Sequence, residues 1–189
     1  MYDIRRVRKR TYEELVALRL GEDEAARSAR FPVAMILEDI RSLYNVGSIF
    51  RSADAFRLSE LILTGFTPTP PRKEISKTAL GADRTVPWRS FNEHSDRWRN
   101  TVDAITTMRE GGWHTLALEI TTKPQPLDML TSEQYPLCIV VGNELTGISP
   151  QALDACEGAI EIPMYGVKHS LNVAVAAGIA MFEAVRQLP

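Results

Sequence analysis

Cysteine is scarce in this chain, and its spacing excludes most cysteine chemistry. Only Cys138 and Cys156 occur among 189 residues, and they lack the close pairing that a zinc site requires. Cys138 lies in an apolar run, where a buried free thiol is commoner than a disulfide. We therefore expect no structural disulfide and no bound metal.

Long apolar runs are also absent. The longest is about a dozen residues, whereas a helix needs about 20 to cross a bilayer. The first residues are polar and basic, and no apolar core follows them, which is not the pattern of a secretion signal. These features predict a soluble, cytoplasmic protein that does not contact a membrane.

Neither sign of charge dominates. The formal net charge is −2 and the isoelectric point is about 6.0, so binding to nucleic acid would need a local basic patch. The stretch RRVRKR, residues 5–10, holds five cations in six residues. This stretch is either a solvated N-terminal arm or an anchor for nucleic acid, and its composition leaves both open.

What the chain does have is enough apolar sequence for one sizeable domain, with 44% hydrophobic residues. Apolar runs that read as buried strands alternate with helical patterns, which predicts a parallel sheet with helices on both sides. The expected strands are residues 31–37, 59–65, 86–88, 113–120, 135–144 and 158–164. The expected helices are residues 12–28, 45–56, 75–81, 95–110 and 150–155, with a last one within 165–188. At the start of the first, Thr11 and Glu14 have the spacing of a capping box, and Leu15 and Leu18 form a face expected to pack on the domain. In such sheets the ligand crevice lies at the carboxyl ends of the strands.

The first candidate stretch is NVGSIFR, residues 45–51. Asn45 is a good N-cap residue, and Gly47 in the first turn of a helix suggests close approach by another group. Arg51 follows one turn later on the same face. Alone, the stretch fits an ordinary capped helix with a surface arginine.

The second candidate stretch is VVGNELTGIS, residues 140–149, which leaves the most apolar strand. Gly142 and Gly147 would let a ligand lie against bare backbone, and Glu144 places a carboxylate at the crevice. The pattern is neither a P-loop nor a dinucleotide fingerprint. Alone, it fits a plain turn between a strand and a helix.

The third candidate stretch is IPMYGVKHSLNVAVA, residues 162–176. Ser170 is the expected cap of an all-apolar, buried helix, and Asn172 is costly to bury unpaired. Gly178 costs about 1 kcal/mol relative to alanine in a helix, so we expect tight packing against it, either from a strongly interlocked backbone or from a partner subunit. His169 could act as a base, although a surface or structural histidine is the commoner role.

Taken together and in this order, the three stretches resemble the signature motifs of the SpoU-type (TrmH-like) RNA ribose 2′-O-methyltransferases, in the SPOUT superfamily. The resemblance runs from about residue 34 to residue 186, and SKTALGADRTVPW, residues 76–88, also resembles a family segment. It implies an α/β fold in which a parallel sheet is flanked by helices and the C-terminal part forms a deep trefoil knot, a rare topology. A basic arm and helix (1–30) would precede the methyltransferase domain (31–189). S-adenosylmethionine would be the cofactor and the active unit a homodimer.

The resemblance also implies which residues form the site. Those expected to bind the cofactor, mostly through backbone groups, are Leu118, Glu119, Gly142, Ile162, Met164 and Leu171. Those expected to carry the chemistry are Arg51, Asn45, Glu144, Ser170 and Asn172. The expected RNA contacts are Arg5, Arg6, Arg8, Lys9 and Arg41.

Three alternatives bear on the reaction and the substrate. A methyltransferase of the same superfamily could modify a base instead of the ribose, and a non-catalytic RNA-binding module could keep the same fold. An ordinary nucleotide-binding α/β domain is disfavoured because no phosphate loop is present. Many relatives carry an extra N-terminal RNA-binding domain or a C-terminal extension, and we expect neither in this protein. Its small size favours tRNA over rRNA, since a compact RNA can be recognised by shape.

Overall fold

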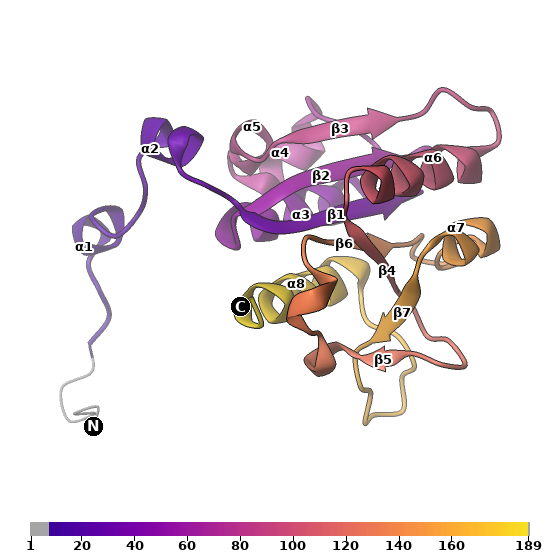
Figure 1. Ribbon diagram of the computed structural model, residues 1–189. Helices are drawn as coiled ribbons and strands as arrows, with labels where there is room; N and C mark the ends of the chain where they lie inside the picture. The colour runs from indigo at the N-terminus through magenta and orange to yellow at the C-terminus, as the bar shows by residue number, and fades with distance from the viewer. Residues whose placement is uncertain (1–7, 189) are drawn as a thin grey trace.

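A seven-stranded sheet forms the centre of the molecule. The computed structural model describes residues 8–188 and gives the strand order β3-β2-β1-β6-β4-β7-β5 (Figure 1). Each pairing between neighbouring strands is parallel, as expected. The strands are β1 (Phe31–Glu38), β2 (Leu58–Thr64), β3 (Trp88–Phe91), β4 (His114–Leu118), β5 (Gln125–Pro126), β6 (Leu137–Val141) and β7 (Gly158–Glu161).

Helices cover both faces of this sheet, so the fold has three layers. One face carries α3 (Leu43–Ala55) and α8 (Val173–Arg186), which pack on each other, with α4 (Lys73–Ala79) and α5 (Ala82–Thr85) beside α3. The other face carries α6 (Arg97–Glu110) and α7 (Pro150–Ala155) (Figure 1). The α/β class with a parallel sheet flanked by helices is therefore confirmed.

The central strands explain why these runs are apolar on both sides. In β1, Val33, Met35 and Leu37 point into the core under α3 and α8, whereas Ala34 and Ile36 point into the core under α6. Alternate side chains of a strand point to opposite faces, so a strand with helices on both sides must be apolar throughout. Cys138 of β6 lies in this core as a buried free thiol, as expected. Burial raises the pKa of both free thiols, that of Cys156 to about 12.

The N-terminal segment differs from the single helix expected over residues 12–28. Two short helices form instead, α1 (Tyr12–Val16) and α2 (Glu22–Arg27), with Gly21 as the N-cap of the second. The predicted Thr11–Glu14 capping box is present. The predicted packing of Leu15 and Leu18 on the domain is wrong, because α1 buries no residue and Leu18 is 64% exposed. Figure 1 shows α1 standing away from the sheet.

Helix α8 is less buried than its sequence suggested. Ala177, Ala180, Met181 and Ala184 are buried against the sheet and α3, but an apolar stripe on the opposite side is exposed. This stripe, called the α8 stripe below, consists of Val175, Ile179 and Phe182. Among the described residues of this chain, a Cβ on Gly178 would meet only Ser52 Oγ, at 3.7 Å, so the chain itself does not supply the expected tight packing there.

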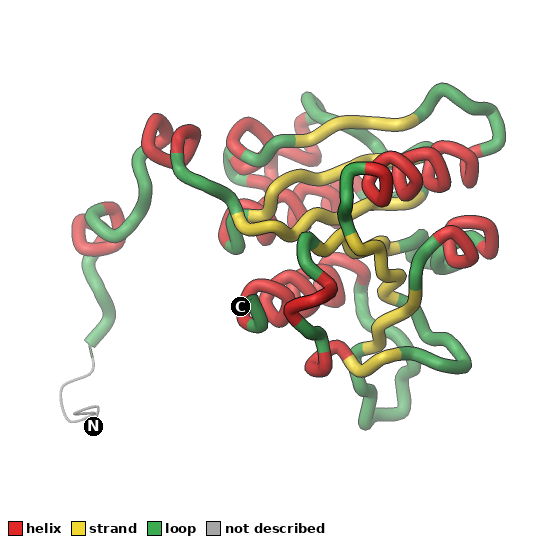
Figure 2. Tube along the Cα trace, in the orientation of Figure 1, coloured by secondary structure: helices red, strands yellow, loops and turns green. Residues whose placement is uncertain are grey.

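Two further observations concern the residues that the structure describes. Within residues 8–188, no helix combines the length and the apolar character that crossing a membrane requires. A long loop, residues 162–172, joins β7 to α8 and returns the chain from one end of the sheet toward α3 (Figure 2).

Candidate functional site

A cavity of about 620 Å³ opens at the carboxyl ends of β4, β6 and β7. Its walls come from the loop after β4, the loop between β6 and α7, and the β7–α8 loop with the first turn of α8. This is the edge where a parallel sheet is expected to form its ligand crevice. All six residues expected to bind the cofactor line the cavity: Leu118, Glu119, Gly142, Ile162, Met164 and Leu171. Glu144, Ser170 and Asn172 line it as well.

The glycines of the second stretch are required by the loop itself. Asn143 and Gly147 form an isolated antiparallel bridge. The Asn143 N–H donates to the Gly147 carbonyl oxygen (3.0 Å), and the Gly147 N–H donates to the Asn143 carbonyl oxygen (2.9 Å). A Cβ on Gly142 would lie 2.3 Å from the carbonyl carbon of Gly147. Gly147 has a φ of 68°, which favours glycine. The tight loop fixes the main chain that forms the cavity wall.

Glu119, which directly follows β4, holds this loop in place by hydrogen bonds. Its Oε2 accepts a hydrogen bond from the Ile148 N–H (3.0 Å), and its Oε1 accepts one from the Ile120 N–H (2.9 Å). The side chain therefore holds two walls of the cavity together. This anchoring was not evident from the sequence, because it depends on a partner about 30 residues away.

Glu144 joins the second stretch to the first. Its carboxylate accepts hydrogen bonds from the Arg41 N–H (2.9 Å), the Ser42 N–H (3.0 Å) and the Asn45 side-chain amide (2.9 Å). Partial burial alone would raise the pKa of Glu144, but these hydrogen bonds outweigh it and hold the pKa below its usual value. The Asn172 amide then donates to Oδ1 of Asn45 (3.2 Å). One chain of side chains thus connects all three candidate stretches.

The helix caps differ from those expected, and the difference explains this chain of contacts. Ser42, not Asn45, caps α3, since its hydroxyl accepts from the Asn45 N–H (3.3 Å). Asn172, not Ser170, caps α8 by accepting from the Ala174 N–H (2.9 Å). Because α3 begins two residues before the predicted start, the amide of Asn45 is free to bridge Glu144 and Asn172.

Arg51 lies apart from the cavity of its own chain. It is exposed on α3 and is not among the cavity-lining residues, whereas Ser170 and His169 are both exposed at the cavity. Asn45, Glu144 and Asn172 are brought together, but within one chain Arg51 is not brought to them.

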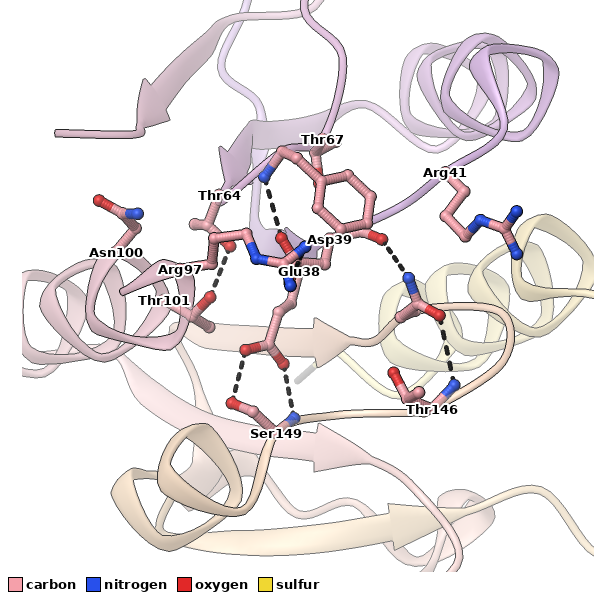
Figure 3. Close-up of polar contacts among 12 residues, drawn as sticks. Glu38, Asp39, Arg41, Thr64, Thr67, Arg97, Asn100, Thr101, Thr146 and Ser149 are labelled. Carbon is pink, nitrogen blue, oxygen red and sulfur yellow. Dashed lines mark hydrogen bonds and ion pairs between the residues drawn. The ribbon is translucent and has the colours of Figure 1, made fainter. Parts of the chain in front are cut away.

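The basic residues expected to contact RNA are spread over two regions. Arg5 and Arg6 lie outside the described residues. Arg8 pairs with Glu14 (2.5 Å) and Lys9 is exposed. Arg41 lies beside Glu144, which accepts a hydrogen bond from its main-chain N–H, and its side chain stands clear of the hydrogen bonds drawn in Figure 3.

A buried carboxylate beside the cavity was missed by the sequence analysis. Glu38 ends β1, is only 2% exposed, and accepts hydrogen bonds from the Ser149 N–H (2.9 Å) and hydroxyl (2.6 Å) (Figure 3). Burial raises its pKa and outweighs the hydrogen bonds from Ser149. A charged residue ending an apolar strand was the available signal. Glu38 fixes the start of α7, and with it the far end of the second stretch.

Comparison with known proteins places the chain in a family. The SpoU rRNA Methylase family matches residues 32–182. The 23S rRNA (guanosine-2′-O-)-methyltransferase RlmB of Vibrio parahaemolyticus is 33% identical over 176 residues, 91% of this chain and 67% of that protein. The tRNA (guanosine(18)-2′-O)-methyltransferase of Thermus thermophilus is 29% identical over 93% of this chain and 85% of that protein. An AdoMet-bound rRNA methyltransferase from Sinorhizobium meliloti superposes with a TM-score of 0.74 at 27% identity, covering 89% of this chain and 60% of that one.

The matches named above cover more of this chain than of the proteins that it resembles. The chain spans 60 to 67% of the length of the three Vibrio RlmB proteins that it matches. The matched part of this chain nevertheless includes the whole sheet except the first residue of β1, all three candidate stretches and most of α8. On this evidence, the chain belongs to the SpoU rRNA Methylase family.

Proposed function

We propose that this chain is an S-adenosylmethionine-dependent methyltransferase that modifies the 2′-hydroxyl of a ribose in RNA. The observation that carries the proposal is the single cavity formed by the second and third stretches and tied to the first through Glu144, Asn45 and Asn172. The relatives named above carry out, by their names, ribose methylation of 23S rRNA and of tRNA. A division into a basic arm (1–30) and a methyltransferase domain (31–189) belongs to the same proposal.

The cavity suits this cofactor in size and chemistry. Its volume, about 620 Å³, is within the range of about 300–1,000 Å³ that small-molecule sites occupy. Leu118, Ile162 and Leu171 offer apolar surface for an adenine ring, and Met164 and Gly142 complete the wall. Glu119 adds a carboxylate where a cationic ligand would be bound. When bound, S-adenosylmethionine supplies a methyl group already activated by its sulfonium.

The residues of this chain then have to align the ribose and remove a proton from a weakly acidic alcohol. We assign Arg51 to stabilising the negative charge that develops on the 2′-oxygen, since a guanidinium stays protonated at neutral pH. The proton would pass to a phosphate oxygen of the RNA, or through the Ser170 hydroxyl to water. Asn45, Glu144 and Asn172 would hold the cavity walls in fixed positions relative to one another during this step.

We also propose a homodimer, and the position of Arg51 supports it. Since Arg51 is outside the cavity of its own chain, it would act at the cavity of a second copy. The α8 stripe supports this arrangement, because Phe182 is 53% exposed and Val175 and Ile179 lie on the same side of the helix. We also propose the trefoil knot. The return of the β7–α8 loop from one end of the sheet to α8, packed on α3, supports it.

The reaction can be tested with purified protein, S-adenosylmethionine and unmodified transcripts of tRNA and 23S rRNA. Nuclease digestion followed by mass spectrometry should find a methyl group on a ribose, and the modified position should resist alkaline cleavage. We expect tRNA to be the better substrate. We also propose that the enzyme is cytoplasmic. A methylated base would favour the base-modifying alternative. Failure to bind S-adenosylmethionine by calorimetry would favour the non-catalytic module.

A further inference from the structure

The exposed face of α3 carries the feature from which we draw a new inference. Tyr44, Ser48 and Arg51 are spaced by four and three residues, so they share one side of the helix. Tyr44 and Arg51 are both exposed, and the Tyr44 side chain is 50% exposed. Seven residues separate them, which is about 10 Å along a helix. An aromatic ring therefore stands two turns from the arginine assigned to the reaction.

Helix α4 approaches this face closely because of Gly47. A Cβ on Gly47 would lie 2.3 Å from the Ile75 carbonyl oxygen and 2.1 Å from Thr78 Oγ1, so only glycine admits this crossing. The Thr78 hydroxyl donates to the Tyr44 carbonyl oxygen (3.1 Å) and fixes the two helices together. The close approach of another group, expected at Gly47 from the sequence, is therefore that of α4.

The crossing places a lysine on the tyrosine. Lys77 Nζ lies 6.0 Å from the centre of the Tyr44 ring, which is within the range of a cation–π contact. Lys73 is exposed one turn before Lys77 on the same side of α4. Arg41 is exposed three residues before Tyr44. Among the side chains that the structure describes, none of Arg41, Arg51 and Lys77 has a carboxylate partner within 4.0 Å.

We infer that Tyr44, Lys77, Arg41 and Arg51 form a docking surface for an unpaired segment of the substrate RNA, named the Tyr44 platform. A half-exposed ring beside uncompensated cations matches the alternation of bases and phosphates in a single strand. Tyr44 would stack on a base next to the target ribose, and Lys77 and Arg41 would contact the flanking phosphates. A duplex would not fit, because its bases are already stacked on each other. This inference rests on the proposed function, since it takes RNA as the substrate.

The test compares binding of a fluorescently labelled single-stranded RNA dodecamer with binding of the same sequence as a blunt duplex. Tyr44→Ala should raise the Kd for the single strand about 30-fold, the middle of the range for loss of one stacked base. Tyr44→Phe should stay within about twofold of wild type, because stacking needs the ring and not the hydroxyl. Neither variant should change the Kd for S-adenosylmethionine, since Tyr44 does not line the cavity.

The charge contribution is tested with a matched pair of variants. Lys77→Gln should weaken binding and reduce the slope of log K against log salt by about 0.7, the value for one phosphate contact on a single strand. Arg109→Gln removes a cation near the end of α6, which lies on the other face of the sheet from α3 and α4, and should leave this slope unchanged.

Two outcomes would overturn the inference, and they are distinct from failure of the proposed function. Unchanged single-strand binding by Tyr44→Ala would exclude stacking on this ring. Tyr44→Ala could also weaken self-association in sedimentation. If RNA affinity then falls only as far as the fraction of associated protein falls, the platform is a contact between subunits. If wild-type protein binds the single strand through Tyr44 but methylates no RNA, the proposed function fails and the platform stands.

Discussion

Replacing Glu144 with alanine tests the link between the first and second stretches. Glu144 accepts three hydrogen bonds, from the N–H groups of Arg41 and Ser42 and from the amide of Asn45. Water can reach this site, so each bond is worth about 0.5–1 kcal/mol, at the low end of the usual range. The variant should therefore lose about 2 kcal/mol of unfolding free energy, which corresponds to a drop in Tm of about 4–8 °C for a chain of this size.

Urea denaturation followed by circular dichroism measures this loss. The difference between wild type and Glu144→Ala should also depend on pH. Because the pKa of Glu144 is lowered in the folded protein, its contribution is fully present above the usual pKa of a glutamate, about 4.3. It should disappear as the pH falls through the folded value. Glu93→Ala, which removes an exposed loop carboxylate, is the control. Equal stability of Glu144→Ala and wild type at pH 7 would refute the reasoning.

Three further predictions concern the helix crossing, the buried carboxylate and the chemistry. Gly47→Ala should destabilise the protein by about 1–3 kcal/mol because α4 must move, whereas Gly178→Ala should stabilise it by about 0.5–1 kcal/mol. Thermal unfolding measures both, and a Gly47→Ala variant as stable as wild type would contradict the packing at Gly47. The raised pKa of Glu38 means that unfolding free energy falls as the pH rises from about 4.3 through its folded value. Glu38→Gln should remove that fall and be at least as stable as wild type at pH 8, and a less stable variant there would count against it. Arg51→Ala should abolish methyl transfer and leave the Kd for S-adenosylmethionine unchanged; full activity would end its assignment.

The sequence sufficed for the parts of the fold that depend on local pattern. The run at residues 31–37 is apolar on both faces because helices cover both, so it could be recognised as a central strand. Helix α7 was expected at its observed bounds, since Ser149 caps it and Pro150 begins it. The two-residue strand β5 was missed, because it has no pattern of its own and exists only through pairing with β7.

Long-range partners account for the remaining errors. Asn45 looks like an N-cap by residue type, and only the positions of Glu144 and Asn172 show why its amide is used elsewhere. The apolar α8 sequence did not distinguish residues buried in the chain from the exposed α8 stripe, since both are apolar. Glu38 could not be paired with Ser149 from a separation of more than a hundred residues.

The central claim is that three stretches far apart in the sequence form one methyl-transfer site, completed by a second copy of the chain. A crystal structure with S-adenosylhomocysteine tests it most directly. We predict the ligand in the cavity between Leu118, Gly142 and Leu171, with Arg51 of the second copy next to Ser170. A ligand bound elsewhere, or Arg51 remote from Ser170 in both copies, would contradict the claim.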